Sequence, residues 1–191
     1  NKQAPTTSAQ KHQQAIPAHS EASCSRTSTK ECTYTLGTVL IGDVLMSNVL
    51  ASDLSGRCTP HNININDYSA MFEIIESANP FKNYIIVLTD HVEIEEVTKL
   101  SIAILAKNSN AKIYMAEPLN LKTIEQRHCF MSLCYSLKLR VIPTRKLRDK
   151  STGAPDVRLF HPENASLNES GIIRFFDTVA RYVPHWVNVL P

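Results

Sequence analysis

The chain has 191 residues, of which 43% are apolar, and its formal net charge is only +2. This length and apolar content suit one domain with a single large core, whereas so small a total charge says little about partners. No apolar leader and no apolar run near membrane-spanning length is present, so we expect a soluble, cytoplasmic protein without a membrane partner.

Residues 1–31 are rich in Ser, Thr, Gln, Ala and Lys and contain almost no large apolar side chain. Such a segment cannot bury enough apolar surface to offset the entropy that is lost on ordering. We therefore predict a flexible polar lead-in over 1–31 and a folded domain over 32–191.

Short apolar runs begin the folded part of the chain. The first run, at 38–41, predicts a strand, and the alternation of Ile63 and Ile65 with Asn predicts a second strand. Asn66 or Asp67 can cap a helix after it. The unbroken apolar run at 84–88 is typical of a strand that is buried on both faces.

Strand and helix patterns then alternate to the end of the chain. We predict a helix from 94 to 108, a strand at 112–115, a helix at 123–139, a strand at 139–142 and a last helix over 172–182. This order indicates an α/β protein, a three-layer α/β/α sandwich with a central parallel sheet. Ligands of such sheets usually bind beyond the carboxyl ends of the strands.

The chain has five cysteines, an odd number, and no Cys-x-x-Cys pair. Cys129 and Cys134 fall on an apolar stretch of a predicted helix, so we expect reduced core thiols. The histidines show no zinc-ligand spacing. We therefore expect neither a metal nor another cofactor.

Three short blocks follow predicted strands or precede the last helix. They are Gly-Asp-Val at 42–44, Leu-Thr-Asp-His at 88–91, and Glu-Asn-Ala-Ser-Leu-Asn-Glu-Ser-Gly at 163–171. In order and spacing they resemble blocks of the SGNH (GDSL-like) hydrolase family, namely Gly-Asp-Ser, Gly-Thr-Asn-Asp and Asp-x-x-His-Leu-Asn-Glu-x-Gly. The resemblance extends from about 38 to 183 and implies an SGNH hydrolase-like fold; another doubly wound domain is the alternative.

The chain departs from the family at the positions that carry its chemistry. Val44 stands where the family has its nucleophilic serine, and Ser166 stands at the position of the catalytic base. Valine has no lone pair, and a serine hydroxyl cannot accept a proton near neutral pH. Asp90, at the position of an oxyanion-stabilising asparagine, would place a negative charge against the developing oxyanion. We therefore predict a degenerate site and no enzymatic activity.

Within this family the chain resembles OSK domains, SGNH-like domains of insect germ plasm organisers that lack the catalytic residues. The three blocks and the end of the chain, from Asn168 to Trp186, carry this similarity. It implies binding of RNA, particularly mRNA 3′ untranslated regions, and assembly of germ plasm ribonucleoprotein granules. It also implies a location in cytoplasmic germ granules or oocyte germ plasm.

A basic segment near the last predicted strand favours RNA independently of the resemblance. Between 138 and 158 it holds seven basic and two acidic residues, a local formal charge of +5. A mobile loop with several cations can follow a phosphate backbone, and arginine can stack on bases. The candidate RNA-binding residues are Lys138, Arg140, Arg145, Lys146, Arg148, Lys150 and Arg158, with Arg57 as an extension. A solvated loop without a ligand is the alternative reading of this charge.

Other residues leave two further hypotheses open. Phe160 and His161 adjoin Arg158 and could stack on bases, although we expect them to pack beneath the loop. Trp186, or the pocket at the degenerate hydrolase-like site, could hold a protein partner, which would make the domain an interaction scaffold. An esterase with a rearranged site would need Ser47 and His161, with Asp156 at a spacing unlike that of the family.

Overall fold

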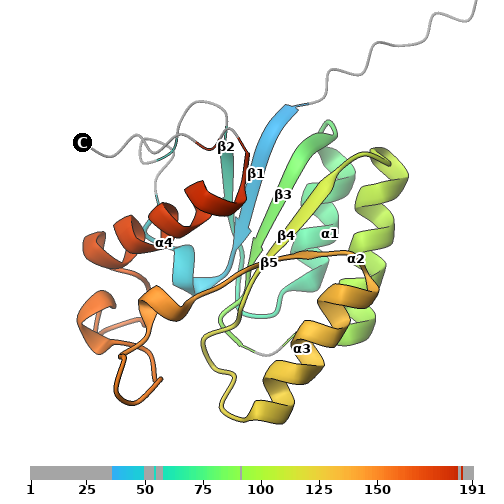
Figure 1. Ribbon diagram of the computed structural model, residues 1–191. Helices are drawn as coiled ribbons and strands as arrows, with labels where there is room; N and C mark the ends of the chain where they lie inside the picture. Colours follow the sequence, from blue (N-terminus) through green and yellow to red (C-terminus); the bar gives the residue numbers. More distant parts are fainter. Residues whose placement is uncertain (1–35, 50–53, 55–57, 91, 185, 187–191) are drawn as a thin grey trace, which may run out of the picture. The chain divides into compact units, whose positions relative to one another are not determined.

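The computed structural model describes residues 36–49, 54, 58–90, 92–184 and 186 (Figure 1). Its five strands form one sheet, in which every pair of neighbours is parallel and the order is β2-β1-β3-β4-β5. The strands are β1 (Leu36–Gly42), β2 (Cys58–Asn62), β3 (Phe81–Val87), β4 (Lys112–Ala116) and β5 (Arg140–Ile142). The lead-in predicted over 1–31 lies outside the described residues, so the predicted domain boundary stays a prediction.

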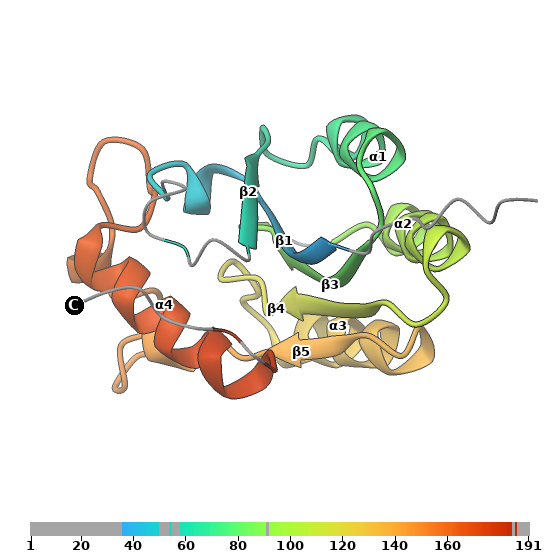
Figure 2. The ribbon, with the colours of Figure 1, turned by 90° about the horizontal axis from the view of Figure 1, so that it is seen from above.

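In the described part of the chain, four α-helices cover the sheet on its two faces. They are α1 (Tyr68–Ser77), α2 (Ile94–Lys107), α3 (Ile124–Ser136) and α4 (Glu169–Tyr182). Seen from above, α1, α2 and α3 lie on one face and α4 lies on the other (Figure 2). The three-layer α/β/α sandwich with a parallel sheet is confirmed.

Successive strand residues enter two separate cores because side chains alternate across a sheet. In β3, Val87 packs in one core with Phe176 of α4, whereas Ile86 packs in the other with Leu100 of α2. A central parallel strand is buried on both faces, which explains the unbroken apolar run. Phe175 and Phe176 are core residues, and Trp186 packs against Phe176 with ring centroids 5.3 Å apart.

The prediction of the second strand was wrong by several residues. The strand is β2, Cys58–Asn62, and it pairs with β1 at the edge of the sheet. Ile63 follows it, and Ile65 is 56% exposed. The Cys-Thr-Pro-His-Asn sequence has no apolar alternation, and Pro60 is tolerated because an edge strand needs fewer backbone donors.

Polar side chains begin three of the helices. The Asp67 carboxylate accepts a hydrogen bond from the backbone N–H of Ala70, as the predicted cap of α1. Thr123 and Gln126 form a capping box at α3. Asn168 accepts from the backbone N–H of Gly171 and so begins α4.

Replacing Gly171 by alanine is expected to lower the free energy of unfolding by about 2–3 kcal/mol. A Cβ at this position would overlap the backbone carbonyl oxygen of Leu159 and lie 2.8 Å from Leu167 Cδ2. Urea denaturation measures the change. Ser170→Ala, at the exposed preceding position of the same helix, is the control and should shift stability by less than about 0.5 kcal/mol. Equal stability of the two variants would contradict the close packing of α4.

The cysteines correct one expectation. Cys134 is buried as predicted, but Cys129 is exposed. Phe130, Leu133 and Cys134 define the core face of α3, and Cys129 is turned by about 100° from Phe130. Burial raises the pKa of the Cys58 and Cys134 thiols to about 12.

Alkylation of the native protein is therefore expected to distinguish the exposed Cys129 thiol from the two buried thiols by their reactivity. At about pH 8, iodoacetamide should modify Cys129, whereas Cys58 and Cys134 should react only after unfolding, since so few of their thiols are ionised. Peptide mapping by mass spectrometry reads out each site. Equal labelling of Cys134 and Cys129 in the folded state would show that the α3 core face is open to solvent.

Candidate functional site

The three blocks that resemble hydrolase motifs meet at the carboxyl edge of the sheet. Asp43 is fully buried, and its carboxylate accepts hydrogen bonds from the backbone N–H of Thr89 at 2.7 Å, the Thr89 hydroxyl and the backbone N–H of Leu45 at 3.2 Å. The backbone N–H of Leu167 donates to the Leu45 carbonyl at 3.0 Å. These bonds hold the first block against both of the others.

The residues at the nucleophile and base positions make structural contacts. Val44 is half-buried at the start of the short helix η1 (Val44–Met46). Ser166 is buried; its hydroxyl donates to Asn164 Oδ1 at 2.6 Å and accepts from Asn48 Nδ2 at 2.7 Å. Asp90 is half-buried directly after Thr89. The valine side chain cannot attack an ester, and the serine hydroxyl is engaged by two amides.

The alternative pair of Asp156 and His161 is not assembled as an acid–base pair. Arg158 binds both carboxylate oxygens of Asp156, with Nε–Oδ1 at 2.9 Å and Nη2–Oδ2 at 2.8 Å, and this lowers the pKa of Asp156. Ser47 is exposed beyond η1. Among the described residues, no hydrogen bond joins the side chains of Ser47, His161 and Asp156 into a relay.

His161 instead lines a cavity of about 370 Å³, which we call the Phe160 cavity. Its walls are mostly apolar, with Thr89, Asn120 and His161 as the polar exceptions. The lining residues are Leu45, Thr89, Leu119, Asn120, Pro155, Val157, Phe160, His161, Pro162 and Ala165. Leu45 directly follows the first block, Thr89 belongs to the second and Ala165 to the third, so this cavity lies beside the three blocks that resemble hydrolase motifs.

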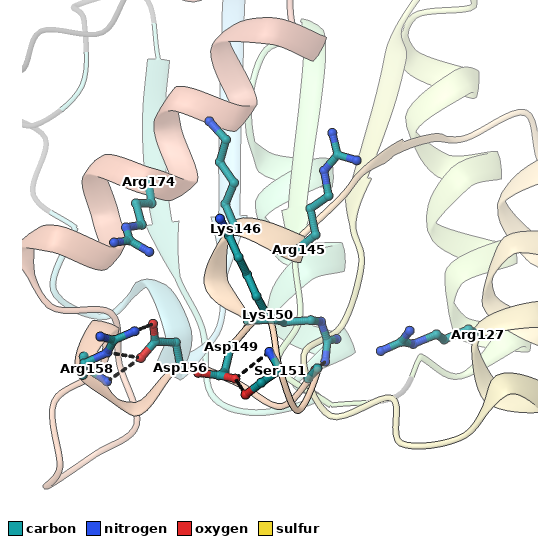
Figure 3. A pocket seen from close by; sticks show the side chains of 11 residues that line it. Arg127, Arg145, Lys146, Asp149, Lys150, Ser151, Asp156, Arg158 and Arg174 are labelled. Carbon is teal, nitrogen blue, oxygen red and sulfur yellow. Dashed lines mark hydrogen bonds and ion pairs between the residues drawn. The ribbon is translucent and has the colours of Figure 1, made fainter.

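A second, larger cavity of about 970 Å³ gathers positive charge, and we call it the basic cavity (Figure 3). Seven cations and two aspartates line it, a formal charge of +5. The cations are Arg127, Arg145, Lys146, Arg148, Lys150, Arg158 and Arg174, and the aspartates are Asp149 and Asp156. Figure 3 shows Arg127 of α3 on the right and Arg174 of α4 on the left, with Arg145, Lys146 and Lys150 between them.

The cations of the basic cavity differ in their partners. Lys146 is paired with Asp177, Arg158 with Asp156, and Arg127 lies 3.8 Å from Glu117. Within the described ranges, no side-chain hydrogen bond or ion pair is made by three exposed cations of the cavity. These are Arg145, Lys150 and Arg174. They are the charges most available to an anionic ligand.

Arg148 and Asp149 stabilise the loop at 148–153, which lines this cavity. Arg148 donates to the carbonyls of Gly153 at 3.1 Å and Pro118 at 3.0 Å, and burial lowers its pKa. Asp149 accepts from the hydroxyl and backbone N–H of Ser151, which hold its pKa at about 2. The loop predicted as mobile thus has a dense set of internal hydrogen bonds.

The structure brings five of the eight predicted RNA-binding residues together in the basic cavity: Arg145, Lys146, Arg148, Lys150 and Arg158. Lys138 and Arg140 do not line it. They lie at the amino end of β5, where the Arg140 guanidinium sits 5.7 Å from the centre of the Tyr114 ring. Arg57 lies outside the described residues.

Sequence reasoning missed Arg127 and Arg174, which are separated from the basic segment along the chain. Arg127 is in the fourth position of α3, near the positive end of the helix dipole, where a cation is unfavourable. That misplaced charge was the only signal for it in the sequence. The sequence holds no such signal for Arg174. This residue reaches the basic cavity because α4 packs beside the 145–147 turn.

Comparisons with known proteins support the fold. No family model and no curated protein matches the chain. A G-D-S-L family protein from Desulfitobacterium hafniense DCB-2 is similar in structure, with a TM-score of 0.58 and 12% identity over 78% of this chain and all of the other.

Two further solved structures agree with it. A GDSL-like protein from Parabacteroides merdae ATCC 43184 has a TM-score of 0.56 and 11% identity over 75% of this chain and 93% of its own. TesA has a TM-score of 0.58 and 9% identity over 78% of this chain and 98% of its own. With its parallel five-stranded sheet between helices, the chain has an SGNH hydrolase-like fold.

The described residues lack two further features. None of their helices combines the length and apolar character needed to cross a membrane. Among the same residues, no group of three or more His, Cys, Asp or Glu side chains is placed to hold a metal ion.

Proposed function

We propose that this chain is a non-catalytic RNA-binding domain on an SGNH hydrolase-like fold, similar to the OSK domain of Oskar. Its ligand is mRNA, with 3′ untranslated regions as the target, and its role is ribonucleoprotein assembly in germ plasm granules. The observation that carries the proposal is the basic cavity, where α3, α4 and segment 145–158 converge with a formal charge of +5.

The charge distribution supports an extended anion as the ligand. Arg145, Lys150 and Arg174 have no ion pair among the described residues, and they lie apart around a cavity of about 970 Å³. A single phosphate would engage only one part of such a cavity, whereas a nucleic-acid backbone offers successive phosphates to several cations. Release of counterions from that backbone would drive binding.

Photo-crosslinking to an mRNA 3′ untranslated region, read by mass spectrometry, tests the site. Adducts are expected on segment 145–158 and on peptides containing Arg127 or Arg174. Affinity is expected to fall steeply with salt concentration. Adducts elsewhere would contradict the assignment of the site, and binding without salt dependence would contradict phosphate recognition.

The proposal of a pseudoenzyme predicts no hydrolysis of p-nitrophenyl acetate above the uncatalysed rate. Val44 cannot act as a nucleophile, and Ser166 has no neighbouring imidazole in its hydrogen bonds. Release of p-nitrophenol at 405 nm measures the reaction. Turnover that is abolished by Ser47→Ala or His161→Ala would instead establish an esterase with a rearranged site.

A protein-interaction scaffold is the second candidate, and one observation favours it. Ile124, Met131 and Tyr135 are 71%, 50% and 88% exposed and lie along one face of α3, separate from its core residues. Such a stripe suits a protein partner. If the scaffold role dominates, Ile124→Glu with Tyr135→Glu should abolish recruitment to granules, while charge reversal in the basic cavity should leave it intact.

A further inference from the structure

The basic cavity and the Phe160 cavity are separated by one short piece of chain. Pro155 and Val157 line the Phe160 cavity, whereas Asp156 and Arg158 line the basic cavity. Alternate residues of 155–158 therefore line different cavities, so this segment is shared by the walls of both. Val157, in this segment, is 81% exposed. A ligand that crosses Val157 can reach both cavities.

We propose that the Phe160 cavity receives one unstacked base of a bound single-stranded RNA, while the basic cavity holds the neighbouring phosphates. This inference rests on the proposed RNA-binding function and adds to it a base-recognition site. It assigns the cavity beside the three hydrolase-like blocks to a nucleobase.

The walls of the Phe160 cavity have the chemistry that a base requires. Phe160, Pro155 and Leu119 offer apolar surface to the faces of a planar ring. Asn120 is exposed, and its side-chain amide makes no hydrogen bond to the described residues, so one donor and one acceptor group are available to a base edge. A volume of about 370 Å³ lies at the lower end of the range of small-ligand sites.

Phe160 is also held in place before any ligand binds. Its side chain packs against the core beneath α4, and its backbone bridges to Leu167. Asn168 Nδ2 and the Asn168 backbone N–H bond to the carbonyls of Arg158 and Leu159, directly before it. A stacking surface that is already ordered loses little entropy on binding. The expectation that Phe160 packs beneath the loop is thus compatible with contact to a base.

Charge complementarity favours RNA over an apolar small molecule or peptide in this cavity. The adjoining basic cavity requires an anionic neighbour, and each base in RNA is covalently attached to a phosphate backbone. An uncharged apolar ligand would fill the Phe160 cavity without engaging Arg145 or Arg174. The combination of an apolar slot with an adjacent cationic surface is the arrangement that single-strand binding proteins use.

An abasic scan of the RNA tests the proposal. A short single-stranded oligonucleotide from a bound 3′ untranslated region is synthesised with one abasic nucleotide at each position in turn. Removal of the base that occupies the cavity is expected to lower affinity by about tenfold, because one stacking contact is lost. Abasic substitutions at most other positions should have little effect, since their phosphates remain.

Asn120→Ala provides the protein side of the experiment, with Asn110→Ala as its matched control. Asn110 is exposed in the α2–β4 turn, at the amino end of the sheet and away from both cavities. The Asn120 variant should bind intact RNA several-fold more weakly and should lose most of the penalty at the sensitive abasic position. A 5-iodouridine at that position should crosslink to the peptide that contains Phe160 and His161.

The outcomes separate this inference from the function on which it rests. If charge reversal at Arg145 and Arg174 abolishes binding but the abasic scan is flat and Asn120→Ala is silent, the base site is wrong and the RNA interface stands. If charge reversal has no effect, the proposed function itself fails. Crosslinks from the sensitive position to α3 alone would also overturn the base site.

Discussion

Charge reversal at Arg145 or Arg174 is expected to lower affinity for single-stranded RNA by about tenfold or more. Both cations line the basic cavity, and neither is paired with a carboxylate in the described part of the chain. Arg145→Glu and Arg174→Glu each replace an attraction to phosphate by a repulsion. Fluorescence anisotropy at several salt concentrations measures both the affinity and its salt dependence.

The salt dependence identifies the kind of contact that is lost. For single strands, the slope of log affinity against log salt should fall by about 0.7 for each phosphate contact removed. Lys112→Glu is the matched control because Lys112 is exposed at the amino end of β4, on the opposite edge of the sheet. An equal loss from Lys112→Glu would indicate a nonspecific effect of net charge.

Replacing Asp43 by alanine is expected to have the largest effect on stability. The Asp43 carboxylate is fully buried and joins the ends of β1 and β3 through Thr89 and Leu45. The substitution leaves three donors without their acceptor and opens a small cavity, at a cost of about 3 kcal/mol or more. For a domain of this size, the melting temperature should fall by roughly 10 °C.

Two control variants distinguish the loss of the hydrogen bonds to Asp43 from a general effect of removing an aspartate. Asp67→Ala removes the cap of α1, a half-buried single contact, and should cost about 1 kcal/mol. Thr89→Val removes only one of the donors to Asp43 and should be intermediate. A loss for Asp43→Ala no larger than that for Asp67→Ala would show that the Gly-Asp block is not a structural junction.

This role explains why the Gly-Asp part of the block can persist beside Val44. Asp43 bonds to backbone groups that the fold must satisfy, whereas the following side chain is half-buried at the start of η1 and carries no hydrogen bond. Ser166 is a similar case, since its hydroxyl joins Asn48 to Asn164. These residues of the three blocks thus form a set of structural contacts beside the Phe160 cavity.

Much of the fold was predictable because the spacing of apolar residues, which reflects their burial in a strand or helix, is visible among residues that are neighbours in the chain. The apolar run ending at Leu88 indicated β3, and Asp67 was one of the two caps expected for α1. β2 escaped prediction because an edge strand is buried on fewer sides and so needs fewer apolar residues. The exposed Cys129 escaped because α3 carries apolar residues on all of its faces.

The sequence by itself determined the α/β class, the order of its elements and the basic character of segment 138–158, because these depend on residues that are neighbours in the chain. Only the tertiary structure decided which cations share a cavity: it added Arg127 and Arg174 and left Lys138 and Arg140 at the other end of β5. The physical reason is that a parallel sheet brings strand ends and helices from distant parts of the chain to one edge. The positive charge at that edge, and the position of Val157 between the two cavities, depend on tertiary packing and cannot be read from a local sequence pattern.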